Sequence, residues 1–232
     1  MRGIRAILFD AGGTLVHVNG EAICRAAGLP YTESSFRDAE AAAHRQVRRW
    51  IAERPDSTDA ERLPVYIDGM LRELGIEDEA ARAAGTRRIA EENARASLWS
   101  RPGEGAVSTL ETLRGRGYRL GVISNSNGHV RKLLQQARLA PFLEVIIDSS
   151  EVGIEKPDPR IFFAATEQLA LMPSVCSYVG DIYEIDVLGA RAAGLAPILI
   201  GSCAAPEPVE RVAALADLLA LFPPLTAGEP VP

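Results

Sequence analysis

The chain has 232 residues, of which 47% are hydrophobic and 24% charged, which is typical of a folded globular protein with one large domain or a core with a smaller insert. A net charge of −6 argues against a nucleic-acid-binding surface, which usually requires a basic face. Three widely spaced cysteines, Cys24, Cys176 and Cys203, lack the spacing of a zinc site or a disulfide framework and indicate small core residues in a reducing compartment.

The first predicted element is a strand over residues 4–10 that ends on Asp10 and is followed by Gly-Gly-Thr. Its apolar residues are continuous, which favours a buried parallel strand. A carboxylate at the end of such a strand faces the crevice where open α/β sheets bind ligands, although an Asp before a glycine turn is also common without a function. Because the strand starts so early we expect no signal peptide, and no apolar stretch reaches the ~20 residues of a membrane span. We therefore expect a cytoplasmic protein that binds no membrane.

Residues 17–99 contain helical patterns and no run that resembles a strand. Four helices are predicted, over 21–28, 32–55, 63–75 and 78–98. The second has a stripe of apolar residues at helical spacing, and its many arginines alternate with Ala, Glu and Asp as on a solvated face. This segment is therefore predicted to be a compact all-α insert.

After Pro102 and Gly103 the chain alternates between helices and strands. Helices are predicted over 104–115, 127–138, 158–170, 184–193 and 207–221, and strands over 118–124, 143–147, 175–180 and 195–200. This alternation favours parallel strands joined by right-handed crossovers. We thus predict an α/β, Rossmann-like parallel-sheet core formed by residues 1–16 and 100–232, with a small helical bundle (17–99) inserted after the first strand. The Pro-rich tail, 223–232, is predicted to be loose.

Three further motifs carry polar residues in this second half. Ser124 ends a predicted strand and Asn125 follows it, a pair that is also typical of a plain turn. Lys156 precedes Pro-Asp-Pro at a helix start, and it is one of only two lysines in an Arg-rich chain. Asp181 follows a predicted strand and Asp186 comes five residues later, although Asp181 alone could cap the next helix.

In this order, Asp10, Ser124, Lys156 and the pair Asp181 and Asp186 resemble the four motifs of the haloacid dehalogenase-like (HAD) hydrolase superfamily. The resemblance implies that Asp10 attacks a phosphoryl group of a small phosphorylated metabolite and becomes an aspartyl phosphate. Such a reaction between two anions requires a divalent cation, and Mg²⁺ prefers one or two carboxylates together with other oxygen ligands.

The resemblance also assigns roles to the other residues. Asp10, Asp181 and the Gly12 carbonyl would hold Mg²⁺, with Asp186 bound through water or orienting these ligands. Lys156, Ser124 and Asn125 would bind the phosphoryl group, and Thr14 is expected to bond to the local turn and help orient Asp10. The insert would be a cap of the family's first type over the active site. We expect a monomer or a homodimer, while the sequence does not identify the substrate.

One position departs from the family pattern, because Gly12 stands where the phosphatases have a second Asp that serves as acid and base. Three hypotheses follow. In the first, the protein is a phosphatase for substrates with good leaving groups, or it uses an acid/base residue from elsewhere in the chain, with His17, Glu33, Asp38 and His44 as candidates. In the second, it is a phosphate-ester-binding or regulatory protein with little turnover. Or it is a dehalogenase or phosphonatase, although dehalogenases lack the acid matched by Asp181 and phosphonatases use a cap Lys that this insert lacks.

A signalling receiver module also uses strand-end Asp residues, Mg²⁺ and a Lys. Such a module has no need of a lid, so the insert after the first strand argues against it.

Overall fold

The computed structural model describes residues 3–226 of the chain. It divides into two compact units, one formed by Met1–His17 with Arg101–Pro232 and the other by Val18–Ser100, which we call the core unit and the helical unit. Each of these boundaries lies one residue C-terminal to the predicted one. A short antiparallel pair, β2 (Val16–His17) with β3 (Arg101–Pro102), joins the two chain segments of the core unit where the helical unit is inserted.

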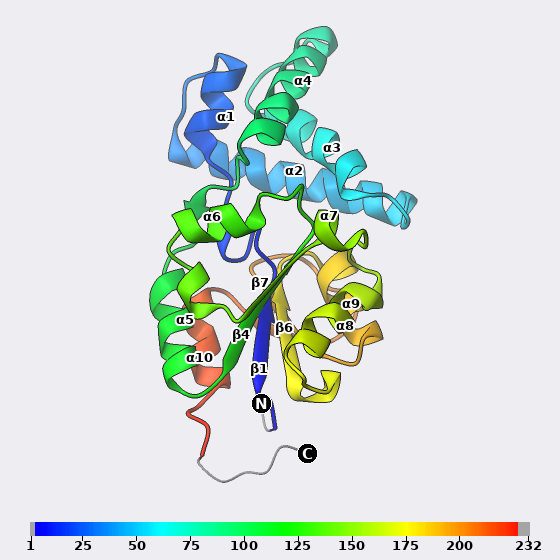
Figure 1. Cartoon of the computed structure of the whole chain (residues 1–232). Coiled ribbons are helices and arrows are strands. Elements are labelled where there is room, and N and C mark those ends of the chain that lie inside the picture. Colours follow the sequence, from blue (N-terminus) through cyan, green and yellow to red (C-terminus); the bar gives the residue numbers. More distant parts are fainter. Residues whose placement is uncertain (1–2, 227–232) are drawn as a thin grey trace. The chain divides into compact units, whose positions relative to one another are not determined.

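The core unit is built on a six-stranded parallel sheet with the order β5-β4-β1-β6-β7-β8 (Figure 1). Its strands are β1 (Ala6–Phe9), β4 (Arg119–Ser124), β5 (Val145–Asp148), β6 (Cys176–Gly180), β7 (Ala196–Ile200) and β8 (Glu210–Val212). The predicted Rossmann-like α/β core is thereby confirmed. The strand order reverses between β1 and β6, and ligands of open α/β sheets bind beyond the carboxyl ends of the strands at such a point.

Helices cover both faces of this sheet, with α5 and α10 on one side and α8 and α9 on the other in Figure 1. The helices are α5 (Ala106–Gly115), α6 (Val130–Gln136), α7 (Ser149–Val152), α8 (Pro159–Gln168), α9 (Leu188–Ala192) and α10 (Leu218–Leu221). Leu8 of β1, Tyr178 of β6 and Phe162 of α8 belong to one buried cluster. Burial from both sides explains why β1, with the sequence Ala-Ile-Leu-Phe, is continuously apolar.

The predicted helix over 207–221 is wrong. Residues 210–212 form β8, which pairs in parallel with β7, and helical structure is limited to a 3₁₀ turn, Leu215–Asp217, and the short α10. Val212, Leu215, Leu218 and Phe222 are buried at a spacing that also fits a helix, which explains the error. Pro206 and Pro208 lack a backbone N–H and disfavour helical conformation in the residues before them, so the chain enters this segment extended.

The end of the chain was predicted to be loose, and residues 227–232 of that tail lie outside the described range. The part that is described is attached to the core unit. The Tyr118 hydroxyl donates to the Pro223 carbonyl at 2.8 Å, and the Leu225 N–H donates to the Arg116 carbonyl at 2.9 Å. The prediction therefore fails for this stretch.

The helical unit contains the four predicted helices, α1 (Gly20–Ala27), α2 (Glu33–Glu53), α3 (Asp59–Glu73) and α4 (Glu79–Arg95). Side chains cap α1, α2 and α4, since Asn19 accepts from the Ala22 N–H, Thr32 from the Ser35 N–H and Asp78 from the Ala81 N–H. Phe36, Ala39, Ala43, Val47 and Ile51 on α2 are buried, as the apolar stripe predicts, whereas Trp50 is partly exposed. Within residues 3–226, no helix is both long and apolar enough to cross a membrane.

We predict that Gly121→Ala destabilises the core unit. A Cβ at this position of β4 would lie 2.3 Å from Cγ1 of Val145 on β5 and 2.8 Å from Cδ2 of Leu8 on β1. Overpacking of this kind costs about 1–3 kcal/mol, so the midpoint of urea unfolding should fall. Gly115→Ala is the matched control because a Cβ there meets no atom within 4 Å, and it should be neutral or slightly stabilising. Equal midpoints for the two variants would contradict the prediction.

Candidate active site

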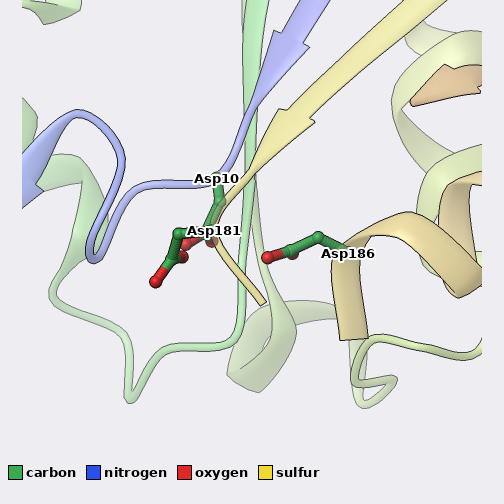
Figure 2. A group of neighbouring side chains, drawn as sticks. All are labelled: Asp10, Asp181 and Asp186. Atoms are coloured by element: carbon green, nitrogen blue, oxygen red, sulfur yellow. The ribbon is translucent and has the colours of Figure 1, made fainter. Parts of the chain in front are cut away.

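The predicted acidic residues meet at the carboxyl edge of the sheet, where the strand order reverses. Asp10 follows β1 and Asp181 follows the neighbouring strand β6, while Asp186 lies in a π-helical turn, Tyr183–Val187. Each of the three offers a ligand oxygen, and these oxygens all lie within 4.8 Å of one another. Figure 2 shows Asp10 and Asp181 side by side, with Asp186 pointing toward them from its helical turn.

Lys156 lies inside this group and is only 3% exposed. Its Nζ donates to Oδ1 of Asp10 at 2.6 Å, to Oδ1 of Asp186 at 2.7 Å and to the hydroxyl of Tyr178 at 2.8 Å. The Asn125 side chain holds the main chain of the same lysine, since it accepts from the Lys156 N–H at 2.8 Å and donates to the Lys156 carbonyl at 3.1 Å. The loop after β4 and the loop before α8 are thus fixed together around one ammonium group.

The turn after Asp10 is shaped by Gly13, which has a φ of +80°. A Cβ on Gly13 would lie 2.5 Å from Oδ2 of Asp181, so the turn needs glycine here both for its conformation and for the close approach of the acid. The backbone hydrogen bonds of the turn end on the carbonyls of Ala11 and Val16. Within residues 3–226 the Gly12 carbonyl accepts none, which leaves its oxygen available to a ligand.

The two acids after β6 have different surroundings. Oδ2 of Asp186 accepts from the Ile182 N–H at 2.9 Å, and a Cβ on Gly180 would lie 2.3 Å from Cγ of Asp186. Oδ1 of Asp181 is buried and has no hydrogen-bond partner in the described part of the chain. Asp181 does not cap the following helical turn, whose N-cap is Ile182 without a side-chain bond. A buried, unpaired carboxylate oxygen is costly and calls for a partner.

The site carries an excess of negative charge, because three carboxylates surround one ammonium. Burial raises the pKa of Asp10 to about 6, with Lys156 lowering it and Asp186 raising it. Burial also raises the pKa of Asp181 well above its usual range, and the charges of Asp186 and Asp10 add to this. Although burial opposes the charged form of Lys156, Asp10 and Asp186 hold its pKa well above the usual value.

These residues fit a bound Mg²⁺. Three ionised carboxylates and one ammonium have a formal charge of −2, which one dication would neutralise. The unpaired Asp181 oxygen, the free Gly12 carbonyl and Asp10 are the hard oxygen ligands that this ion prefers. Gly13 and Gly180 allow Asp181 and Asp186 to lie close to the backbone of the site, because a Cβ on either glycine would collide with one of these acids.

Comparison with known proteins identifies the family, since residues 4–194 match the haloacid dehalogenase-like hydrolases. The chain belongs to this family. It is 30% identical over 210 residues to a glyceraldehyde 3-phosphate phosphatase of Methanothermobacter thermautotrophicus, with 86% of each chain covered. It is 33% identical over 138 residues to the cattle haloacid dehalogenase-like hydrolase domain-containing protein 3, of which that match spans 53%.

A crystal structure of a dehalogenase with an intermediate complex resembles the fold of this hydrolase. The TM-score is 0.69 at 24% identity, with 96% of this chain and 98% of the other covered.

Ser124 and Thr14 were also predicted to contribute to this hydrolase site. Ser124, the last residue of β4, is buried, and its hydroxyl makes only a long contact of 3.5 Å to the Asn125 carbonyl. The prediction for Thr14 is wrong, because its buried hydroxyl has no hydrogen-bond partner among the described residues and does not bond to the turn. The backbone N–H groups of Gly13, Leu15 and Val16 already close the turn, so its formation does not depend on the Thr14 hydroxyl.

The candidate acid/base residues lie in both units. His17 is on β2 of the core unit, where burial and the charge of Arg101 lower its pKa, so it is neutral near pH 7. Glu33, Asp38 and His44 are on α2 of the helical unit, where Glu33 accepts from the Tyr31 hydroxyl and His44 packs edge-on against Tyr66 at 5.2 Å. Sequence reasoning missed Tyr178, because an aromatic residue within a buried strand carries no sign of a polar contact.

We predict that Mg²⁺ stabilises the protein and that Asp181→Asn abolishes this effect. A carboxyl whose folded-state pKa is raised binds its proton more tightly in the folded than in the unfolded state. The stability of the ion-free protein should therefore fall as pH rises through the interval from the unfolded pKa to about 6 for Asp10. The ion must displace these protons, so its stabilising effect should be larger near pH 8 than near pH 5. For a chain of this length, each kcal/mol of added unfolding free energy raises the melting temperature by about 2–4 °C.

The measurement is a thermal melt with and without millimolar Mg²⁺. Asp181→Asn removes a buried charge, so its ion-free melting temperature should equal or exceed that of the wild type. Asp148→Asn is the control, since Asp148 is buried at the end of β5 but accepts from the Gly128 and Ser150 N–H groups outside the acidic cluster. A shift as large in Asp181→Asn as in Asp148→Asn would exclude Asp181 as a ligand.

Proposed function

We propose that this hydrolase is a Mg²⁺-dependent phosphatase that acts on a small phosphorylated metabolite through an aspartyl phosphate on Asp10. The observation that carries the proposal is the buried Lys156 ammonium, 2.6 Å from Asp10 and surrounded by a cluster of three acids. The relative named glyceraldehyde 3-phosphate phosphatase, aligned over 86% of each chain, supports a phosphomonoester substrate.

Asp10, Asp181 and the Gly12 carbonyl would hold the cation, with Asp186 orienting these ligands. When bound, Mg²⁺ neutralises the charge that otherwise keeps an anionic nucleophile away from an anionic substrate. An Asp10 carboxylate oxygen then attacks the phosphorus, the bond to the ester oxygen breaks, and the alcohol leaves after it gains a proton. Water hydrolyses the acyl phosphate, which releases inorganic phosphate and restores the carboxylate.

The protein's own donors would position the transferred group. Lys156 holds the nucleophile and can donate to a phosphoryl oxygen as negative charge spreads over it. Ser124 has a buried hydroxyl without a strong partner, and Asn125 lies at the same strand end. We assign both to phosphate binding, and we assign substrate selection to the helical unit, acting as a cap (residues 17–99) on the core (1–16 and 100–232). We also propose a cytoplasmic monomer or homodimer.

Gly12 favours a second candidate function, which is binding of a phosphate ester with little turnover. A positioned acid/base is worth about 10² to 10⁴ in rate, and Gly12 has no side chain to supply it. The first function then requires a substrate with a good leaving group or a proton donor elsewhere in the protein.

We predict that Asp10→Asn abolishes phosphate release. An amide cannot form the acyl phosphate, so turnover should fall to background on every phosphomonoester that the wild type hydrolyses with Mg²⁺. A phosphate-release screen over a panel of phosphorylated metabolites measures this, with Asp148→Asn as a buried control that should keep its activity. If most of the activity survives in Asp10→Asn, covalent catalysis by Asp10 is excluded. If the wild type releases phosphate from none of the substrates, the phosphate-ester-binding function is favoured.

We predict that Gly12→Asp increases turnover of aliphatic phosphates, whose alkoxide leaving groups need a proton, by about tenfold or more. The backbone conformation at residue 12 permits this substitution, because the left-handed φ angle belongs to Gly13 and not to Gly12. Gly12→Asn is the matched control, because it has the same shape without an acid. If both variants are folded and equally active, another group already transfers the proton.

A further inference from the structure

Tyr178 completes the hydrogen bonding of Lys156. An ammonium group has three protons and no acceptor, and Lys156 uses them on Asp10, Asp186 and Tyr178, at 2.6, 2.7 and 2.8 Å. Two of these partners are carboxylates and the third is a neutral phenol. The direction of all three N–H bonds is therefore fixed in the described structure.

The phenol is itself held in one orientation. Because a lysine can only donate, the Tyr178 oxygen accepts from it, and its single proton goes to the Ile123 carbonyl at 3.0 Å. A contact of 3.4 Å to Asp186 is longer and weaker. Ile123 is on β4 directly before Ser124. Tyr178 thus connects the lysine to the backbone of the strand that ends in the proposed phosphate-binding residues.

The ring of Tyr178 cannot move easily. It is fully buried, and it lies edge-on against Phe162 of α8 with the ring centroids 4.9 Å apart. Its backbone is in β6, between β1 and β7, with Leu8 and Pro197 as its register partners. A rigid strand and a packed ring thereby place the hydroxyl, as required of a group that positions another.

We propose that Tyr178 is a positioning residue that holds the Lys156 ammonium in register with the Asp10 carboxylate. The proposal rests on the proposed function, in which Lys156 contacts both the nucleophile and the transferred phosphoryl group. All three bonds are charge-assisted because their donor is an ammonium group, and the two to carboxylates also gain from the attraction between opposite charges. The bond to Tyr178 adds a third fixed direction to the ammonium group, which the two carboxylates alone do not supply.

The kinetic test is Tyr178→Phe, which keeps the ring and removes the hydroxyl. Loss of alignment between reacting groups should lower kcat about 10-fold to 100-fold, while KM changes by less than about threefold because the other phosphate donors remain. Tyr118→Phe is the matched control: Tyr118 is also buried, donates to a backbone carbonyl (Pro223, 2.8 Å) and packs edge-on against an aromatic ring, but it does not contact Lys156. It should retain the wild-type kcat.

A double-mutant cycle separates positioning from general damage to the fold. If Tyr178 acts through the lysine, Tyr178→Phe should cause no further loss when Lys156 is already replaced by Met. Losses that multiply, or a kcat of Tyr178→Phe equal to that of Tyr118→Phe, would overturn the proposal.

A measurement without turnover keeps the proposal separate from the proposed function. The chain has only two lysines, Lys132 and Lys156, and Lys132 is exposed. In protein labelled with ¹⁵N-lysine, the buried ammonium should give a slowly exchanging NMR signal that Tyr178→Phe broadens and Tyr118→Phe leaves unchanged. If this result holds while the wild type hydrolyses no phosphoester, the positioning role stands and the phosphatase function fails. An unchanged signal in Tyr178→Phe would overturn the positioning role.

Discussion

The arrangement of the site depends on one buried ammonium shared between two carboxylates. Lys156, on the loop before α8, reaches Asp10 after β1 and Asp186 in the π-helical turn, so that it joins three separate segments of the core unit. Removing one partner from such a buried group leaves an uncompensated charge, which typically costs about 3–5 kcal/mol. The lysine is thus a structural requirement of this edge of the sheet before it has any role in chemistry.

The same interaction explains why a third acid can be placed here. Lys156 occupies one oxygen of Asp10 and one of Asp186, and the Ile182 N–H occupies the other oxygen of Asp186. Asp181 receives no such compensation, and its Oδ1 is buried without a partner in the described structure. The lysine and backbone therefore fix two acids and leave one oxygen of the third without a partner in the described structure. This division between satisfied and unsatisfied oxygens is stronger evidence for an ion than the number of acids alone.

The sequence was sufficient to predict the parallel sheet, the helical insert and the positions of Asp10, Lys156 and Asp181. Residues that follow buried strands in an α/β pattern meet at one edge, so spacing along the chain translates into proximity. Individual side-chain contacts are not encoded in this way, which is why the role of Tyr178 within β6 was missed and the bonding of Thr14 in the turn after β1 was predicted wrongly. The last predicted helix was wrong over residues 210–212, which pair with β7, because the buried Val212 continues the helical spacing of Leu215 and Leu218.

The two glycines after Asp10 differ in what they contribute, and this bears on the missing second acid. Gly13 is required by geometry, since its backbone is left-handed and a Cβ would collide with Asp181. The backbone of Gly12 is not left-handed, so no conformational constraint of the turn reserves this position for glycine. The φ angle at residue 12 therefore does not explain why a glycine stands where the family resemblance leads us to expect an acid.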